Sequence, residues 1–110
     1  MKDFTLGILG NNFKETTEFI NKIILNTKAS CDQEHMKMNI IINNKLLNDK
    51  EEIKKVLNKL ETIKSDFLCL TFNNKEIYNF IKENTTIPVL NNNFSEDKLV
   101  NEILNKFYEA

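Results

Sequence analysis

The hydrophobic positions of this chain alternate between short apolar runs and longer amphipathic stretches. The apolar runs are rich in β-branched and aromatic residues and end in polar turn residues, which predicts strands. The amphipathic stretches carry apolar residues three and four positions apart, which predicts helices. The predicted strands are Phe4–Leu9, Met36–Ile42, Phe67–Phe72 and Ile87–Leu90.

A predicted helix follows each predicted strand. The first two helices begin at Asn12 and Asn48, each with a glutamate three residues later, which is the spacing of a capping box. The third begins at Asn73 and the last at Ser95. Their apolar stripes are, in chain order, Phe13, Thr16, Thr17, Ile20, Ile23, Ile24 and Thr27; Ile53, Val56, Leu57, Leu60 and Ile63; Ile77, Phe80 and Ile81; Leu99, Val100, Ile103, Leu104 and Phe107.

Four strands that are each followed by a helix require right-handed crossovers, which favours a parallel sheet. We therefore expect an α/β fold: a single three-layer domain with a four-stranded parallel sheet in the order 2-1-3-4 and helices on both faces. The lone proline, Pro88, is expected to begin the fourth strand, where a missing N–H costs least. A length of 110 residues, 41% of them hydrophobic, fits one domain over residues 1–110.

Composition excludes several classes of partner. The net charge is −1 and all fifteen basic residues are lysines, so the guanidinium groups that suit base edges and phosphates are missing and no nucleic-acid partner is expected. No apolar run approaches about 18 residues and the first residues lack a signal-peptide pattern, so we expect a cytoplasmic protein without a membrane partner.

No metal or cofactor is expected from the motifs. Cys31 and Cys69 lack metal-ligand spacing and a disulfide framework, which indicates free thiols in a reducing compartment. No phosphate-binding or dinucleotide glycine pattern is present, and the strand ends lack the acidic residues of a phosphorylated receiver domain.

Asparagines stand at the carboxyl ends of all four predicted strands, where open α/β sheets bind their ligands. Amides both donate and accept hydrogen bonds, and helix N-termini present free N–H groups at the same edge, so a small carboxylate could be held there. The alternative is an ordinary role in turns and caps, which asparagine also favours. The candidate ligand-binding residues are Gly10, Asn11, Asn12, Asn43, Asn44, Phe72, Asn73 and Asn74.

Several segments together resemble the aspartate/glutamate racemase family. The most specific is Cys31–His35 followed by Ile40–Asn44, which is similar to that family's SDQEH segment and the strand after it. Leu6–Gly10 with Thr16-Thr17 is similar to the family's first strand and turn, which commonly reads GILGGMGP. Asp49-Lys50 stands where many members have Asp-Arg, and Ile87–Leu90 is similar to the family's IPVL strand. Asp66–Asn73 falls on the segment usually written ADFIVIPCNTAH.

The resemblance implies a racemase-like scaffold without its chemistry. Members have two similar lobes, each supplying one cysteine that exchanges a proton with the substrate Cα, whereas this chain resembles a single lobe. Phe72 stands at the first lobe's cysteine position, Asn74 replaces its Thr and Glu76 its His. Phenylalanine cannot exchange a proton, and the bulky Phe13 in the first turn hinders close approach of a ligand to the backbone.

Three functions follow as expectations. The first is a catalytically inactive racemase-like domain that binds a small amino acid or carboxylate. The second is a protein-interaction or dimerisation module, a homodimer or a pair with another racemase-lobe-like chain, with Phe13 and Phe72 on the contact surface. The third is an active racemase or isomerase that uses His35 or Cys31. We expect Cys69 to be core and His35 to orient the loop before the second strand.

Overall fold

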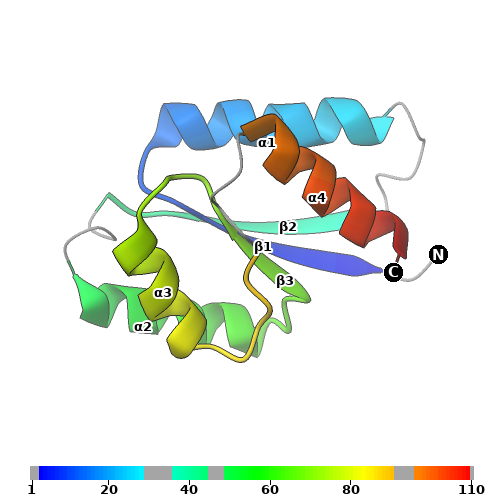
Figure 1. The fold of residues 1–110 in the computed structure, drawn as a ribbon. Coiled ribbons are helices and arrows are strands. Elements are labelled where there is room, and N and C mark those ends of the chain that lie inside the picture. The colour runs from blue at the N-terminus through cyan, green and yellow to red at the C-terminus, as the bar shows by residue number, and fades with distance from the viewer. Residues whose placement is uncertain (1–2, 29–35, 45–48, 91–95, 110) are drawn as a thin grey trace.

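The computed structural model describes residues 3–28, 36–44, 49–90 and 96–109. Figure 1 shows a central sheet with α1 and α4 on one face and α2 and α3 on the other. This arrangement confirms the α/β class with helices on both faces. The elements are β1 (Phe4–Gly10), α1 (Phe13–Lys28), β2 (Met36–Ile42), α2 (Lys50–Thr62), β3 (Phe67–Leu70), α3 (Lys75–Glu83) and α4 (Glu96–Glu109).

The sheet is parallel and its strand order is β2-β1-β3. In the register, Phe4 lies opposite Met36 and Leu6 lies opposite Phe67. All residues of β1 except Thr5 are buried, because helices cover both of its faces and a strand covers each of its edges. The central strand is therefore an apolar run and not an alternating one.

The prediction of a fourth strand over Ile87–Leu90 is wrong. Within the described residues, the segment around Val89 pairs with β3 only at a parallel bridge between Leu68 and Val89. Two hydrogen bonds hold it: the Leu68 N–H donates to the Pro88 carbonyl at 3.0 Å, and the Leu90 N–H donates to the Leu68 carbonyl at 2.8 Å. Pro88 itself has no N–H to donate, and residues 91–95 lie outside the described residues.

β3 ends at Leu70, two residues before the predicted end, so Phe72 lies beyond the strand. The Thr71 N–H still donates to the Leu9 carbonyl at 3.1 Å. The next residue of β1, Gly10, directs its carbonyl to the other neighbour and accepts from the Asn43 N–H at 2.8 Å. β3 therefore has no further backbone partner on β1, and the chain turns towards α3.

Side-chain caps begin the helices, and two lie one residue later than predicted. The Asn12 Oδ1 accepts from the Glu15 N–H at 3.0 Å, as expected for α1. Asp49, and not Asn48, caps α2 by accepting from the N–H groups of its first turn. Asn74, and not Asn73, caps α3 by accepting from the Ile77 N–H at 3.0 Å. Ser95 lies outside the described residues.

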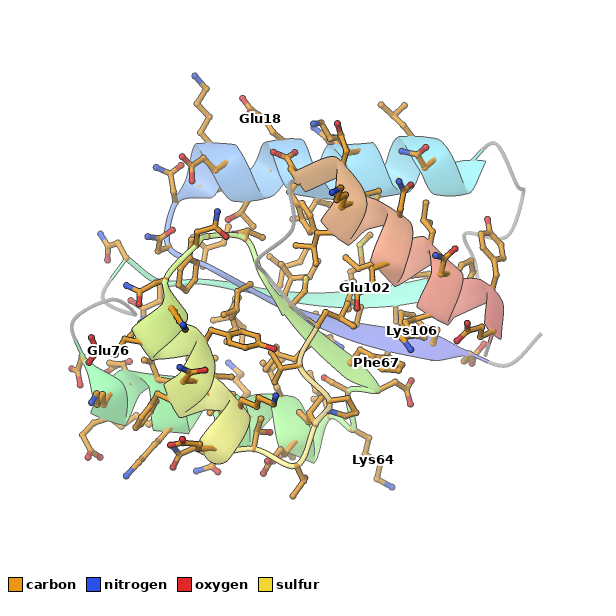
Figure 2. The ribbon with its side chains drawn as sticks, in the orientation of Figure 1. Glu18, Lys64, Phe67, Glu76, Glu102 and Lys106 are labelled. Carbon is orange, nitrogen blue, oxygen red and sulfur yellow. The ribbon has the colours of Figure 1, made fainter. Side chains whose placement is uncertain are left out.

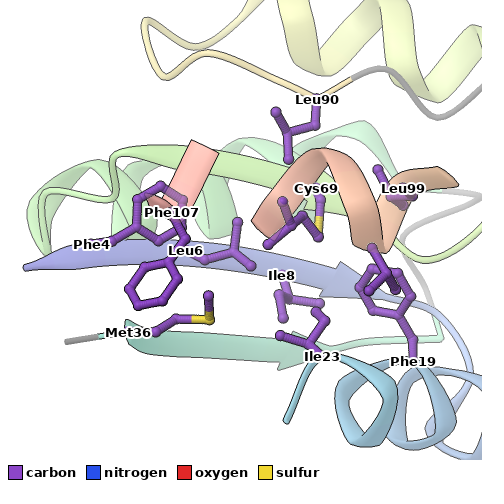
Figure 3. Packing of buried hydrophobic residues seen from close by; sticks show 12 residues of the cluster. Phe4, Leu6, Ile8, Phe19, Ile23, Met36, Cys69, Leu90, Leu99 and Phe107 are labelled. Atoms are coloured by element: carbon purple, nitrogen blue, oxygen red, sulfur yellow. The ribbon is translucent and has the colours of Figure 1, made fainter. Parts of the chain in front are cut away.

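The core consists of two apolar clusters, one on each face of the sheet. The cluster under α1 and α4, shown in Figure 3, contains the fully buried thiol of Cys69. The cluster under α2 and α3 excludes Ile63, which is 43% exposed at the end of α2 although the sequence pattern predicted it to be buried. Within the part of the chain that the structure describes, no helix is both long enough and apolar enough to cross a bilayer.

Candidate functional site

A cavity of about 440 Å³ opens at the carboxyl end of β3, between the beginnings of α1 and α4. The chain runs from β1 to β2 on one side and later to β3 on the other, so the order reverses here, as at the ligand sites of open α/β sheets. The lining residues are Glu15, Glu18, Phe19, Leu70, Thr71, Phe72, Asn73, Glu96 and Leu99.

Thr71, one of the lining residues, contacts a buried threonine of α1. The hydroxyls of Thr16 on α1 and Thr71 after β3 lie 3.0 Å apart and form a hydrogen bond. Gly10 is buried beside them, and a Cβ at Gly10 would collide with the Thr16 side chain and lie 2.9 Å from the Thr71 hydroxyl. Gly10, a predicted ligand contact, therefore provides space for this threonine pair.

The walls of the cavity are acidic. Glu15 and Glu18 come from α1 and Glu96 from α4; Figure 2 shows Glu18 on the side of α1 away from the sheet. Glu96 is partly neutralised by the Lys22 ammonium at 3.1 Å, while Lys22 also lies 3.4 Å from Asp97. Hydrogen bonds to Glu96 and then to Asp97 raise the pKa of Lys22 above its ordinary value. A negative field of this kind favours a cationic group.

The carboxylates are too dispersed to chelate a metal. Among residues 3–28, 36–44, 49–90 and 96–109, no three His, Cys, Asp or Glu side chains converge on a position that could hold a metal ion.

The asparagines predicted to form one ligand-binding edge at the strand ends lie at two separate hollows. Phe72 and Asn73 line the acidic cavity, whereas a separate hollow of about 530 Å³ lies at the ends of β1 and β2. The second hollow is lined by Asn11, Asn12, Phe13, Ile42, Asn43 and Asn44.

The side chains of three of the predicted asparagines form hydrogen bonds within the fold. Asn12 and Asn74 cap helices, and the Asn43 amide donates to the Glu52 carboxylate at 3.4 Å. Of the other predicted asparagines, Asn44 and Asn73 are exposed and Asn11 is half-buried. The sequence alternative, an ordinary turn and cap role, therefore describes Asn12 and Asn74 well.

No cysteine is among the described residues that line the cavity. Phe72 is half-buried there and packs against the α2 and α3 cluster. Cys69 is fully buried in the opposite cluster, and its burial raises the pKa of the thiol far above its ordinary value. Cys31, His35 and the asparagines at 91–93 lie outside the described residues.

Sequence reasoning missed the acidic wall and the threonine pair. Glu15 and Glu18 are one helical turn apart in the helix after β1, which could have indicated a shared face towards the strand ends. Glu96 directly follows Ser95, the predicted start of the last helix, and its position in the sequence does not indicate a cavity. Nothing in the sequence indicated that α4 begins beside α1, which is the packing that closes the cavity.

No protein-family model, no curated protein and no solved structure matches this chain. The resemblance to racemases therefore rests on segments of the sequence alone.

Proposed function

We propose that this chain is a non-catalytic domain of the aspartate/glutamate racemase type that binds a small amino acid through its ammonium group. The proposed site is the acidic cavity at the carboxyl end of β3. The observation that carries the proposal is the lining of that cavity, which includes three glutamates, Glu15, Glu18 and Glu96, together with Thr71 and Asn73.

The absence of catalysis is supported by the groups near the strand ends. Racemisation needs a group that removes a proton from a carbon acid and another that returns it. Phe72 can do neither, and the buried Cys69 keeps its proton because its pKa is raised. Cys69 is also fully buried in the cluster under α1 and α4 and is not among the described residues that line the cavity.

The charge of the cavity supports an ammonium over an isolated carboxylate. The cavity volume of about 440 Å³ falls in the usual range of small-molecule sites. A carboxylate entering it would meet like charges, whereas an ammonium would pair with them. Among the described lining residues, Thr71 and Asn73 carry the neutral polar groups that would face the carboxylate of a bound amino acid. This refines the expectation from the sequence, which considered an amino acid and a carboxylate equally.

Titration followed by backbone amide chemical shifts tests the proposal. The ligands are L- and D-aspartate and L- and D-glutamate, with butylamine and butyrate as probes that carry only one of the two charged groups. We expect saturable shifts at residues 71–73 with the amino acids, weaker shifts with butylamine and none with butyrate. Shifts with butyrate equal to those with butylamine, or no shift with any ligand at millimolar concentration, would overturn the proposal.

A matched pair of variants locates the binding. Glu15→Gln removes a charge from the cavity wall and should weaken amino-acid binding by up to about five-fold, the size of an exposed charge pair. Glu83→Gln removes the same charge from the exposed end of α3 and should leave binding unchanged. Solvent deuterium incorporated at the ligand Cα would contradict the claim of inactivity.

A further inference from the structure

β2 is an edge strand of the described sheet, with β1 on one side only. The hydrogen bond from the Asn43 N–H to the Gly10 carbonyl fixes which residues face β1. In a parallel ladder, alternate residues of a strand bond to the same neighbour. Asn39 and Ile41 therefore face β1, and the backbone groups of Met36, Met38, Ile40 and Ile42 point to the open edge.

The open edge is also apolar on the face that carries α1. Ile40 is 41% exposed and Ile42 is 36% exposed. Phe13, at the start of α1, lines one hollow with Ile42 and is 73% exposed. The helical spacing places Ile20 and Ile24 on the same flank of α1, where they are half-buried. We call these five residues the β2 flank.

Natural edge strands are protected by charges, prolines, bulges or a covering segment, and within the described residues β2 has little of this protection. Its one charged residue is Lys37, near its beginning, where the ammonium lies 3.8 Å from the Asp3 carboxylate. From Met38 to Ile42 the strand has no charge and no proline. An edge of this kind is a template for another strand.

We propose that β2 pairs antiparallel with β2 of a second copy of this chain, with the two-fold axis at Asn39. In this register Met36 lies opposite Ile42 of the second copy, and Met38 lies opposite its Ile40. The backbone N–H and C=O groups that point away from β1 then face the same groups of the second copy. Each pair of facing residues of this kind exchanges two hydrogen bonds. The three-stranded sheet becomes a continuous sheet of two copies.

The charge pattern of β2 favours a second copy in this register. Lys37 lies opposite Ile41 of the copy, so the two ammonium groups are kept apart, and the isoleucines meet methionines on the α1 face. β2 is already ordered within a sheet, so this pairing avoids the conformational entropy that a disordered peptide would lose on binding.

The same axis extends the contact to the helices. It places α1 beside its own copy and antiparallel to it, because both lie on the same face of the joined sheet. Phe13 then approaches Ile24 of the copy, and the two Ile20 side chains approach each other. A two-fold contact of this type is self-complementary and closes, so it gives a dimer and not a fibre.

Sedimentation of the full chain between micromolar and millimolar concentration tests the dimer. We expect a limiting mass of twice 12.9 kDa for the wild type. Ile40→Lys should give a monomer, whereas Ile63→Lys should remain a dimer, because Ile63 has nearly the same exposure, 43%, but lies at the end of α2. Circular dichroism checks that both variants are folded.

Disulfide trapping tests the register independently of the lysine variants. In a Cys31→Ser background, Asn39→Cys should form a covalent dimer under mild oxidation, since facing residues of this type have Cα atoms about 4.5 Å apart. Lys37→Cys should not, because its equivalent in the copy lies about 13 Å further along the strand.

Four outcomes would overturn the proposal: a monomeric wild type at millimolar concentration, equal loss of the dimer in both lysine variants, equal cross-linking at positions 37 and 39, or no cross-linking at position 39. The acidic cavity lies at the end of β3, on the other side of β1. Amide shifts on ligand addition and sedimentation therefore report the two proposals separately, and either can fail without the other.

Discussion

Replacement of Gly10 by alanine tests the account of the threonine pair. Gly10 has no positive φ, so its requirement for glycine is one of space and not of backbone conformation. The new Cβ would collide with Thr16 and lie 2.9 Å from the Thr71 hydroxyl. Gly7→Ala is the matched control in the same strand, because its Cβ would lie 3.1 Å from Leu60 and 3.2 Å from Leu68, at the ends of their side chains.

The magnitudes differ because of what must move. At Gly10 the collision forces a threonine out of place, at about 1–3 kcal/mol for overpacking. Loss of the hydrogen bond between Thr16 and Thr71 adds about 1 kcal/mol, so we expect a total near 3 kcal/mol. At Gly7 the new Cβ meets the ends of flexible leucine side chains, which can move. Replacing glycine by alanine also lowers the entropy of the unfolded chain, which stabilises the fold by about 0.4–1 kcal/mol. The free energy of unfolding should therefore change by less than about 1 kcal/mol.

Urea unfolding measures both variants. Gly10→Ala should lower the midpoint by about 1–2 M relative to Gly7→Ala. Adding Thr16→Ala to Gly10→Ala removes the atoms in collision, so the double variant should lose about 1–2 kcal/mol less than the sum of the single losses. Equal midpoints for the two alanine variants, or additive losses in the double variant, would refute the reasoning.

Three further predictions concern the core, a helix cap and a thiol. Above about pH 8.5, the free energy of unfolding of the wild type should fall relative to that of Cys69→Ala, by up to about 1.4 kcal/mol per pH unit. The reason is that the Cys69 thiol loses its proton in the unfolded chain, whereas burial raises its pKa in the folded chain and keeps it protonated. Parallel pH profiles of the two proteins would contradict this. Asn74→Ala should cost about 1 kcal/mol in urea unfolding, and Asn73→Ala less than about 0.5 kcal/mol, since only Asn74 caps α3. Phe107→Ala should cost about 3–5 kcal/mol by thermal or urea unfolding, against less than about 1 kcal/mol for the exposed Tyr108→Ala; similar losses would show that α4 is not packed as described.

The sheet was predictable where a strand pairs over its whole length. The apolar runs at β1, β2 and β3 and the intervening amphipathic helices led to the expected order 2-1-3 for these strands, which the structure has. The prediction of a fourth strand was wrong because the apolar run of four residues that contains Pro88 makes few backbone hydrogen bonds to β3. Such a short sequence pattern does not show how many of these bonds form. The early end of β3 depends on the carbonyl direction of Gly10, which is a property of the assembled sheet.

The candidate site was less predictable than the fold. Runs of asparagine offered several possible caps, and the choice of Asn74 over Asn73 depends on where α3 begins. The acidic wall requires Glu15 and Glu96, which are far apart in the sequence, to face one cavity. Such a pairing follows from the docking of α4 beside α1, which no local pattern indicates.

The reciprocal bonds between Thr5 and Asp66 have a consequence for synthesis. The Thr5 N–H donates to the Asp66 carboxylate at 2.9 Å and the Asp66 N–H donates to the Thr5 carbonyl at 2.8 Å, across 61 residues of sequence. At about 5–20 residues per second, a ribosome takes about 3–12 seconds to add that much chain. During this interval the central strand is made but its partner β3 is not. The order of the strands along the sequence thus sets a minimum waiting time before the sheet can close.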